Sequence, residues 1–320
     1  GLLAGCSSDS GDTEPTSTDT PTNTETETET ATSTPSPTET VDYAAQRSDL
    51  LDTARSEIES ASGELRPQVD RLELGNWNYR SSIVTDRLDE ATATLEEAGN
   101  LDTDAHADRL EKLDAYAAAT LTLTEAASSM SSAIEQWGLV EQYRNAERYS
   151  DAINQCDPTL TTLEECRSRL SSAADTYPGA IGEGEQGIQD LTWSYNLLDR
   201  WVAGMGQIVS ASQSFEDKFQ KFQEGRDIYE EGGYENAQKA RNIAIDLENK
   251  FRDVSNAFDE VSDSAPPAIR QMSIEWSCIS SNFVAACEGL NQACNGVIAE
   301  DQSRQSDGYD KMRRNDDREC

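Results

Sequence analysis

The residue types that carry out nucleophilic or phosphate chemistry are scarce in this sequence. Its single histidine, His106, lies in the stretch 102–108 (DTDAHAD). A catalytic triad needs a histidine that a carboxylate orients beside a nucleophile, and no Gly-x-Ser-x-Gly motif accompanies this one. The glycine-rich segment 179–184 (GAIGEG) lacks the lysine of a phosphate-binding loop. We therefore expect a protein that is not an enzyme and that needs no cofactor.

The alternating acids of residues 102–108 are the one stretch similar to a cation-binding loop. Carboxylate oxygens at this spacing suit Ca²⁺, but the stretch lacks the glycine at the sixth position of such a loop. It also lacks the acid at the twelfth position, where Leu113 stands. We interpret the acids as residues at a helix N-terminus, where they stabilise the helix dipole and cap free amides. No metal site is predicted.

Cysteines are the remaining candidates for chemistry. After Cys6, six remain, and an even number in an exported domain fits disulfides. They are Cys156, Cys166, Cys278, Cys287, Cys294 and Cys320. No Cys-x₂-Cys pair supports a zinc site.

Helix geometry limits how these cysteines can pair. On one continuous helix Cys278 and Cys287 would lie about 13 Å apart, and Cys287 and Cys294 about 10 Å apart. Both separations exceed the reach of a disulfide. Bonds must therefore join different segments, or Cys320 must fold its tail back. A chain turn at residues 157–158 (DP) would also bring Cys156 and Cys166 together.

Residues 2–6 (LLAGC) resemble a lipobox, the end of a lipoprotein signal peptide. An apolar residue and two small residues precede the cysteine that carries the lipid. We expect residues 1–6 to be a signal-peptide remnant and Cys6 to be attached to the outer face of the cytoplasmic membrane through a lipid.

The segment that follows is suited to be a tether. Residues 7–40 contain 19 Ser or Thr, 8 Asp or Glu and 4 Pro, with Ala31 as the largest apolar side chain. Such a composition cannot bury enough surface to offset its ordering entropy. We predict a disordered stalk over residues 7–41, about 30–35 Å in span as a flexible coil. Its Thr-Glu alternation and prolines resemble an O-glycosylated stalk, and a plain acidic linker would serve the same role.

Acidic residues also dominate the remainder of the chain. The whole sequence has 61 Asp plus Glu against 26 Lys plus Arg, a net charge of -35. Removing the 8 acids of the stalk leaves 53 against 26, or -27. Such a chain cannot neutralise phosphates, so we exclude nucleic acid as a partner. An acidic surface poor in lysine resembles surface proteins of haloarchaea, and a face that recruits a cationic partner or divalent ions is the alternative.

The elements that would position any site are helices. Ala, Leu, Glu, Gln and Arg dominate from residue 42 to 300, and strand-type alternation is scarce. Breaks are predicted after Gly63, at 99–100, at 177–179, at 232–233 and at 264–267. Two candidate helices exceed 40 residues, which favours an elongated antiparallel helical bundle or hairpin array of the all-α class. Residues 301–320 are expected to be a polar tail, and no run of 18 apolar residues predicts a membrane-spanning helix.

One stretch resembles a tetratricopeptide repeat. Its small and aromatic positions are matched by Gly225, Gly232, Tyr234, Ala237 and Ala244. The resemblance implies close helical hairpins, a tyrosine that fills the hairpin, and peptide or protein binding in a concave groove. The equivalent alanines Ala91, Ala152 and Ala237 are 61 and 85 residues apart instead of 34, so no tandem array is predicted. The 85-residue offset suggests instead a duplicated hairpin, over residues 103–176 and 186–262.

Two functions remain open. The leading hypothesis is a non-catalytic, lipid-anchored surface protein whose helical ectodomain binds another protein or supports envelope organisation. The alternative is a module that binds or senses a small solute in a Trp-lined cleft. Trp193, Leu197 and Trp201 form a stripe at i, i+4 and i+8 that would line such a cleft or belong to the core. Trp193, Trp201 and Tyr234 are the candidate ligand or partner surface.

Overall fold

The computed structural model describes residues 42–74, 77–181, 189–261, 263–316 and 320. The chain divides into two units, Gly1–Val41 and Asp42–Cys320. The predicted lipobox with Cys6 and the predicted stalk therefore lie outside the described residues.

The described part of the helical unit contains α-helices joined by short connections and no strand, which confirms the predicted all-α class. Its elements are α1 (Tyr43–Asp70), α2 (Ser81–Gly99), α3 (Ala107–Asn145), α4 (Tyr149–Thr176), α5 (Pro178–Ile181), α6 (Gln189–Glu230), α7 (Tyr234–Asp259), α8 (Pro267–Ile298) and α9 (Gln302–Asn315).

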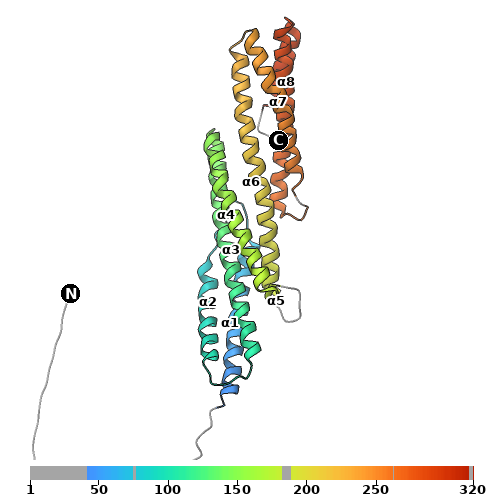
Figure 1. The fold of residues 1–320 in the computed structure, drawn as a ribbon. Coiled ribbons are helices and arrows are strands. Elements are labelled where there is room, and N and C mark those ends of the chain that lie inside the picture. Colours follow the sequence, from blue (N-terminus) through green and yellow to red (C-terminus); the bar gives the residue numbers. More distant parts are fainter. Residues whose placement is uncertain (1–41, 75–76, 182–188, 262, 317–319) are drawn as a thin grey trace, which may run out of the picture. The chain divides into compact units, whose positions relative to one another are not determined.

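Long helices pack as neighbouring hairpins, and α6 is shared by two groups of them (Figure 1). On one side α6 contacts α1, α3 and α4; on the other it contacts α7 and α8. The pairs α3–α4 and α6–α7 are both a long helix followed by a shorter one packed against it. The duplication of residues 103–176 and 186–262 is not tested by this order of helices. That the two pairs superpose remains a prediction.

An aromatic cluster holds α6, α7 and α8 together. Phe215 on α6 lies with its ring centroid 5.5 Å from Phe251 on α7, 5.1 Å from Trp276 and 5.4 Å from Phe283 on α8. All three are edge-to-face contacts, each of which contributes about 0.5–1.5 kcal/mol beyond the area it buries. The cluster fixes the position of α7 on the middle of α6.

Several helix ends lie where the sequence predicts them. Helix α2 ends at Gly99, and α6 ends at Glu230 just before Gly232 and Gly233, whose φ values of 76° and 92° suit glycine. Pro267 begins α8.

Two predicted breaks do not occur, because buried stripes continue across them. Helix α1 runs through Gly63 to Asp70, with Leu65 and Val69 buried beyond the glycine. Helix α4 runs through Pro158, with Thr159 and Leu163 buried beyond it. Tertiary packing outweighs the local preference at both positions.

The segment expected to be a polar tail contains α9, which packs very closely on α8. A Cβ at Gly289 or Gly296 of α8, or at Gly308 of α9, would lie 2.3–2.4 Å from a backbone nitrogen of the opposite helix. Only glycine permits this approach. Beyond α9, Cys320 folds back and forms a disulfide with Cys278 on α8, with the two Cα atoms 6.2 Å apart.

The other four described cysteines are free and buried: Cys156, Cys166, Cys287 and Cys294. The proposed turn that would join Cys156 to Cys166 is absent because α4 is continuous there. The Cys166 thiol donates instead to the Ala126 carbonyl, 3.1 Å away on α3.

Candidate functional site

The residues chosen from the sequence as a ligand surface do not form one site. Trp201 is 3% exposed and belongs to the core. Trp193 is partly buried, and the Arg66 guanidinium lies 5.0 Å from its ring centroid. Tyr234 is 54% exposed at the start of α7, so it does not fill the hairpin as the repeat resemblance implies. About 43 Å of helix separates Trp201 from the end of α6, where Tyr234 follows.

The guanidinium group of Arg47 binds the backbone at and beside the acidic stretch 102–108. Arg47 on α1 is buried and donates to the carbonyls of Ala98 and Ala105, each 2.9 Å away. Asp108 lies in the first turn of α3, where a carboxylate stabilises the helix dipole. Among the described residues, no group of three His, Cys, Asp or Glu side chains is placed to hold a metal ion.

The described free thiols are poor nucleophiles. Burial raises the pKa of Cys156, Cys166 and Cys294 to about 12, and it also raises the pKa of Cys287. At neutral pH these thiols are protonated, and the thiolate is the reactive form. They serve as small apolar side chains in the core.

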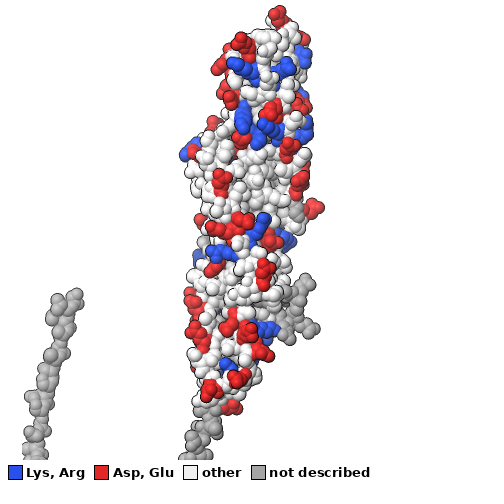
Figure 2. Space-filling model, viewed as in Figure 1, with Lys and Arg blue, Asp and Glu red and all other residues white. Residues whose placement is uncertain are grey.

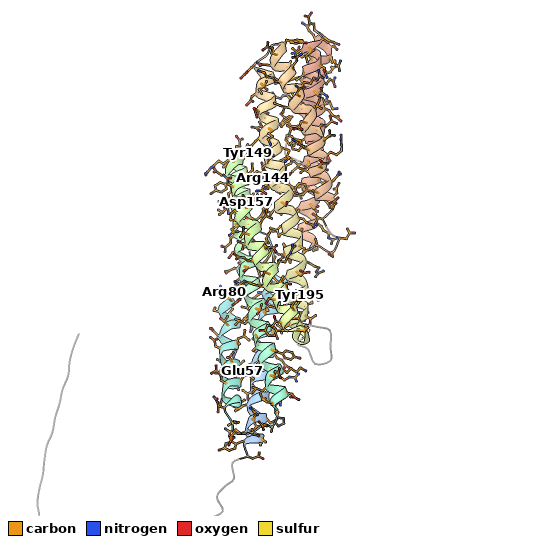
Figure 3. All side chains as sticks on the ribbon, in the orientation of Figure 1. Glu57, Arg80, Arg144, Tyr149, Asp157 and Tyr195 are labelled. Carbon is orange, nitrogen blue, oxygen red and sulfur yellow. A yellow bond between two sulfur atoms is a disulfide. The ribbon has the colours of Figure 1, made fainter. Side chains whose placement is uncertain are left out.

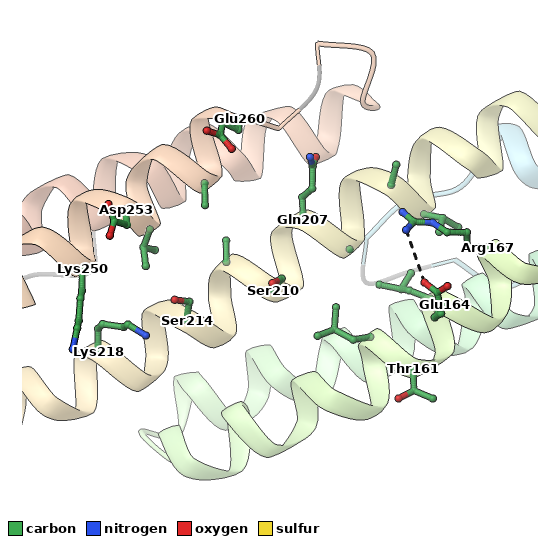
Figure 4. A pocket seen from close by; sticks show the side chains of 18 residues that line it. Thr161, Glu164, Arg167, Gln207, Ser210, Ser214, Lys218, Lys250, Asp253 and Glu260 are labelled. Carbon is green, nitrogen blue, oxygen red and sulfur yellow. Dashed lines mark ion pairs between the residues drawn. The ribbon is translucent and has the colours of Figure 1, made fainter.

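A groove between α4, α6 and α7 is the strongest candidate for a functional site (Figure 4). Its volume is about 1020 Å³. Helix α6 provides the floor from Val202 to Lys218, a length of about 24 Å, and α4 and α7 provide the walls. Since α4 and α7 have no contact with each other, the groove lies open between them.

Small side chains cover most of the floor. They are Ala203, Gly206, Ser210, Ala211 and Ser214. Apolar residues of the walls complete a weakly apolar surface: Leu160 and Leu163 on α4, Val254 and Ala257 on α7. A Cβ added at Gly206 would meet nothing within 4 Å, so the floor is open above this residue. Sequence reasoning missed this surface, although small residues recurring every three or four positions were a visible signal.

Charged side chains are spread along the groove, and the lysines are at one end of it (Figure 4). Lys218, Lys250 and Asp253 line one end, which therefore carries more basic than acidic side chains. Glu164 and Arg167 stand at the other end and pair with each other at 3.8 Å, while Glu260 lies on α7 nearer the middle of the groove.

Lys218 and Lys250 each pair with an aspartate outside the groove, and each has further N–H donors available. Lys218 Nζ lies 3.1 Å from Asp217, and Lys250 Nζ lies 2.6 Å from Asp246. An ammonium group carries three N–H donors, so each lysine can also bind a carboxylate of an occupant.

A buried ion pair connects α6, which forms the floor of the groove, to α3. Arg144, near the end of α3, lies with its Nε 3.2 Å from Glu216 Oε1 on α6, and the Glu216 side chain is fully buried. The guanidinium also lies 4.1 Å from the ring centroid of Trp276 on α8. Figure 3 draws the side chains on the ribbon and labels Arg144 near the end of α3. Arg144 also pairs with Glu141 at 2.6 Å, and together these contacts connect α3, α6 and α8.

A second, smaller groove lies where α6 turns into α7 beside α8 and α9. Its volume is about 720 Å³, and its lining includes Tyr229, Gly232, Val297, Gln305 and Tyr309. The Gln305 amide donates to the Tyr229 hydroxyl across it at 3.3 Å. Neither groove is lined by Trp193 or Trp201.

Comparison with protein-family models, with curated proteins and with solved structures finds no match to this chain. In the part of the chain that the structure describes, every helix is too short or too polar to cross a membrane. The function must therefore be argued from the groove and the sequence.

Proposed function

We propose that this chain is a non-catalytic, lipid-anchored cell-surface protein that binds another protein in the groove between α4, α6 and α7. The lipobox-like residues 2–6 and the Ser/Thr-rich segment 7–41 support an anchor followed by a tether. The acidic surface suits an environment of molar salt, and acidic side chains stand along the whole visible face of the helical unit (Figure 2).

The groove itself carries the proposal of protein binding. Its volume of about 1020 Å³ is at the upper limit of small-molecule pockets. None of its described lining side chains is aromatic, and its charged groups are spread along the groove instead of converging on one point. A small solute is held by convergent polar groups in an enclosed, often aromatic pocket. A long open surface of small and aliphatic residues favours a segment of another protein.

Site-specific photo-crosslinking tests this function on the full chain in its native membranes. A photoreactive phenylalanine replaces Ser210, which is exposed on the groove floor. The matched control replaces Ser132, an exposed serine of α3 that does not line the groove. We expect a discrete protein adduct at Ser210 and none at Ser132. The proposal fails if neither position forms an adduct, or if both form the same ones.

The anchor has a separate test. A Cys6→Ser variant should lose its lipid and leave the membrane fraction for the medium, whereas wild type remains membrane-bound. Mass spectrometry of the N-terminal peptide checks the modification. An unmodified Cys6 in the membrane-bound protein would contradict the anchor and leave the groove unaffected.

A further inference from the structure

We propose that the occupant of the groove is an amphipathic α-helix of about four turns, running parallel to α6. The inference rests on the proposed function and adds to it the shape, direction and charge of the partner segment.

The three helices around the groove are arranged as three members of a four-helix bundle. Helix α4 is antiparallel to α6, because Gln213 donates to Asp157 at 2.7 Å and Gln220 donates to Ser150 at 2.9 Å. The residue numbers rise along α6 while they fall along α4.

Helix α7 is also antiparallel to α6. The ring of Phe215 contacts Phe251, and further along α6 a Cβ at Gly225 would lie 2.9 Å from the Ile243 side chain. Helices α4 and α7 both pack on α6 and not on each other. The position diagonal to α6, which a fourth helix occupies in such a bundle, is the groove.

The floor of the groove permits a close helical approach. Gly206, Ser210 and Ser214 follow each other at i, i+4 and i+8 and form one row along α6. None of these side chains extends past its γ atom, so the axis of an incoming helix can approach to the 8–10 Å typical of packed helices. A floor of about 24 Å accommodates about 16 residues of helix, or slightly more than four turns.

The direction of the incoming helix follows from charge and from its neighbours. A helix parallel to α6 is antiparallel to both walls, the arrangement of neighbours in an up-down bundle. Its N-terminus, which carries partial positive charge, then lies at the end that Glu164 and its ion-pair partner Arg167 line. Its C-terminus lies beside Lys218 and Lys250.

These positions define the chemistry of the partner. One face of its helix carries small and aliphatic residues at i, i+4, i+7 and i+11. A basic side chain in its first turn pairs with the Glu164 carboxylate, which is exposed beside Arg167. Acidic side chains in its last turn accept hydrogen bonds from the free N–H groups of the two lysines.

A displayed peptide library tests the inference without knowledge of the natural partner. The library contains random peptides about 16 residues long, the length that spans the floor as a helix. Selection uses the full chain, and peptides that still bind a Gly206→Leu variant are removed. Gly138→Leu is the matched control, since Gly138 is a helical glycine of α3 that also has nothing within 4 Å of its Cβ position.

We expect groove-dependent peptides that are helical when bound, basic in the first turn and acidic in the last. Their affinity should fall about tenfold in Gly206→Leu and stay unchanged in Gly138→Leu. A Lys218→Glu, Lys250→Glu variant should bind them about fivefold more weakly.

Selected helices with the opposite charge order would overturn the proposed direction. Selected peptides that bind in an extended form, or no groove-dependent peptides, would overturn the helical occupant. In either case an adduct at Ser210 would still support protein binding at the groove, so the failure of this inference differs from the failure of the proposed function.

Discussion

Replacing Gly308 by alanine should weaken the packing of α9 on α8. The new Cβ would lie 2.3 Å from the Ala293 nitrogen and 2.8 Å from its Cα. Carbon atoms pack at about 3.5–4.0 Å, so the two helices must separate by about 1 Å. Forcing a methyl group into a packed contact of this kind costs about 1–3 kcal/mol.

The gain in helix propensity partly masks this cost, and a second glycine separates the two effects. Alanine in place of glycine stabilises a helix interior by about 0.5–1 kcal/mol. Gly63 of α1 has nothing within 4 Å of its Cβ position, so Gly63→Ala shows the propensity effect alone. The two variants should therefore differ in free energy of unfolding by about the cost of the contact, 1–3 kcal/mol.

Urea unfolding followed by circular dichroism, in salt that maintains the fold, measures this difference. Hydrogen exchange of the α9 amides detects local loosening when the disulfide between Cys278 and Cys320 keeps the helix tethered. We expect Gly308→Ala to be less stable than Gly63→Ala, or to exchange faster in residues 302–315. If Gly308→Ala matches Gly63→Ala by both measures, the close packing of α8 and α9 is wrong.

Three further predictions concern the core and the surface. Glu216→Leu should lower the free energy of unfolding by about 1–3 kcal/mol, because Arg144 would lose its fully buried partner while it keeps the Glu141 carboxylate. An unchanged free energy of unfolding in urea would contradict this. The free energy of unfolding should fall as pH rises above about 9, because these thiols ionise there in the unfolded chain, whereas the pKa values of Cys156 and Cys166 in the fold are about 12. The urea midpoint between pH 8 and 11 measures this fall. A midpoint that stays constant in wild type, or that falls equally in a Cys156→Ala, Cys166→Ala variant, would contradict the prediction. Transfer from molar salt to dilute buffer should reduce helicity, because carboxylate repulsion loses its screening, and full helicity without salt would exclude adaptation to high salt.

Local signals in the sequence predict most helix ends correctly. Tertiary contacts explain the predictions that were wrong, namely the breaks at Gly63 and Pro158 and the polar tail at 301–320. The glycines at 232–233 and the prolines at 266–267 end or begin helices by their own backbone preferences, so they were readable. Gly63 and Pro158 lie inside helices because buried residues continue beyond them. Helix α9 has few apolar residues and depends on glycine contacts with α8, which no local pattern shows.

The groove was harder to foresee than the fold for a similar reason. Trp193 and Trp201 were predicted to form a ligand surface because they are large and aromatic. Such residues contribute most to a hydrophobic core when they are buried, and both pack in or against the core here. The groove exists because the floor residues Gly206, Ser210 and Ser214 have side chains no larger than serine. Spacing indicates that these three share a face. It does not indicate that α4 and α7 leave that face uncovered.

Crosslinking at Ser210 in a blocked groove is the most direct test of the central claim that the groove binds a protein. The photoreactive residue at Ser210 is combined with Gly206→Leu, one helical turn away, or with Gly138→Leu on α3. We predict that the protein adduct disappears with Gly206→Leu and persists with Gly138→Leu, while circular dichroism shows both variants folded. An adduct of equal yield in the folded Gly206→Leu protein would contradict the claim.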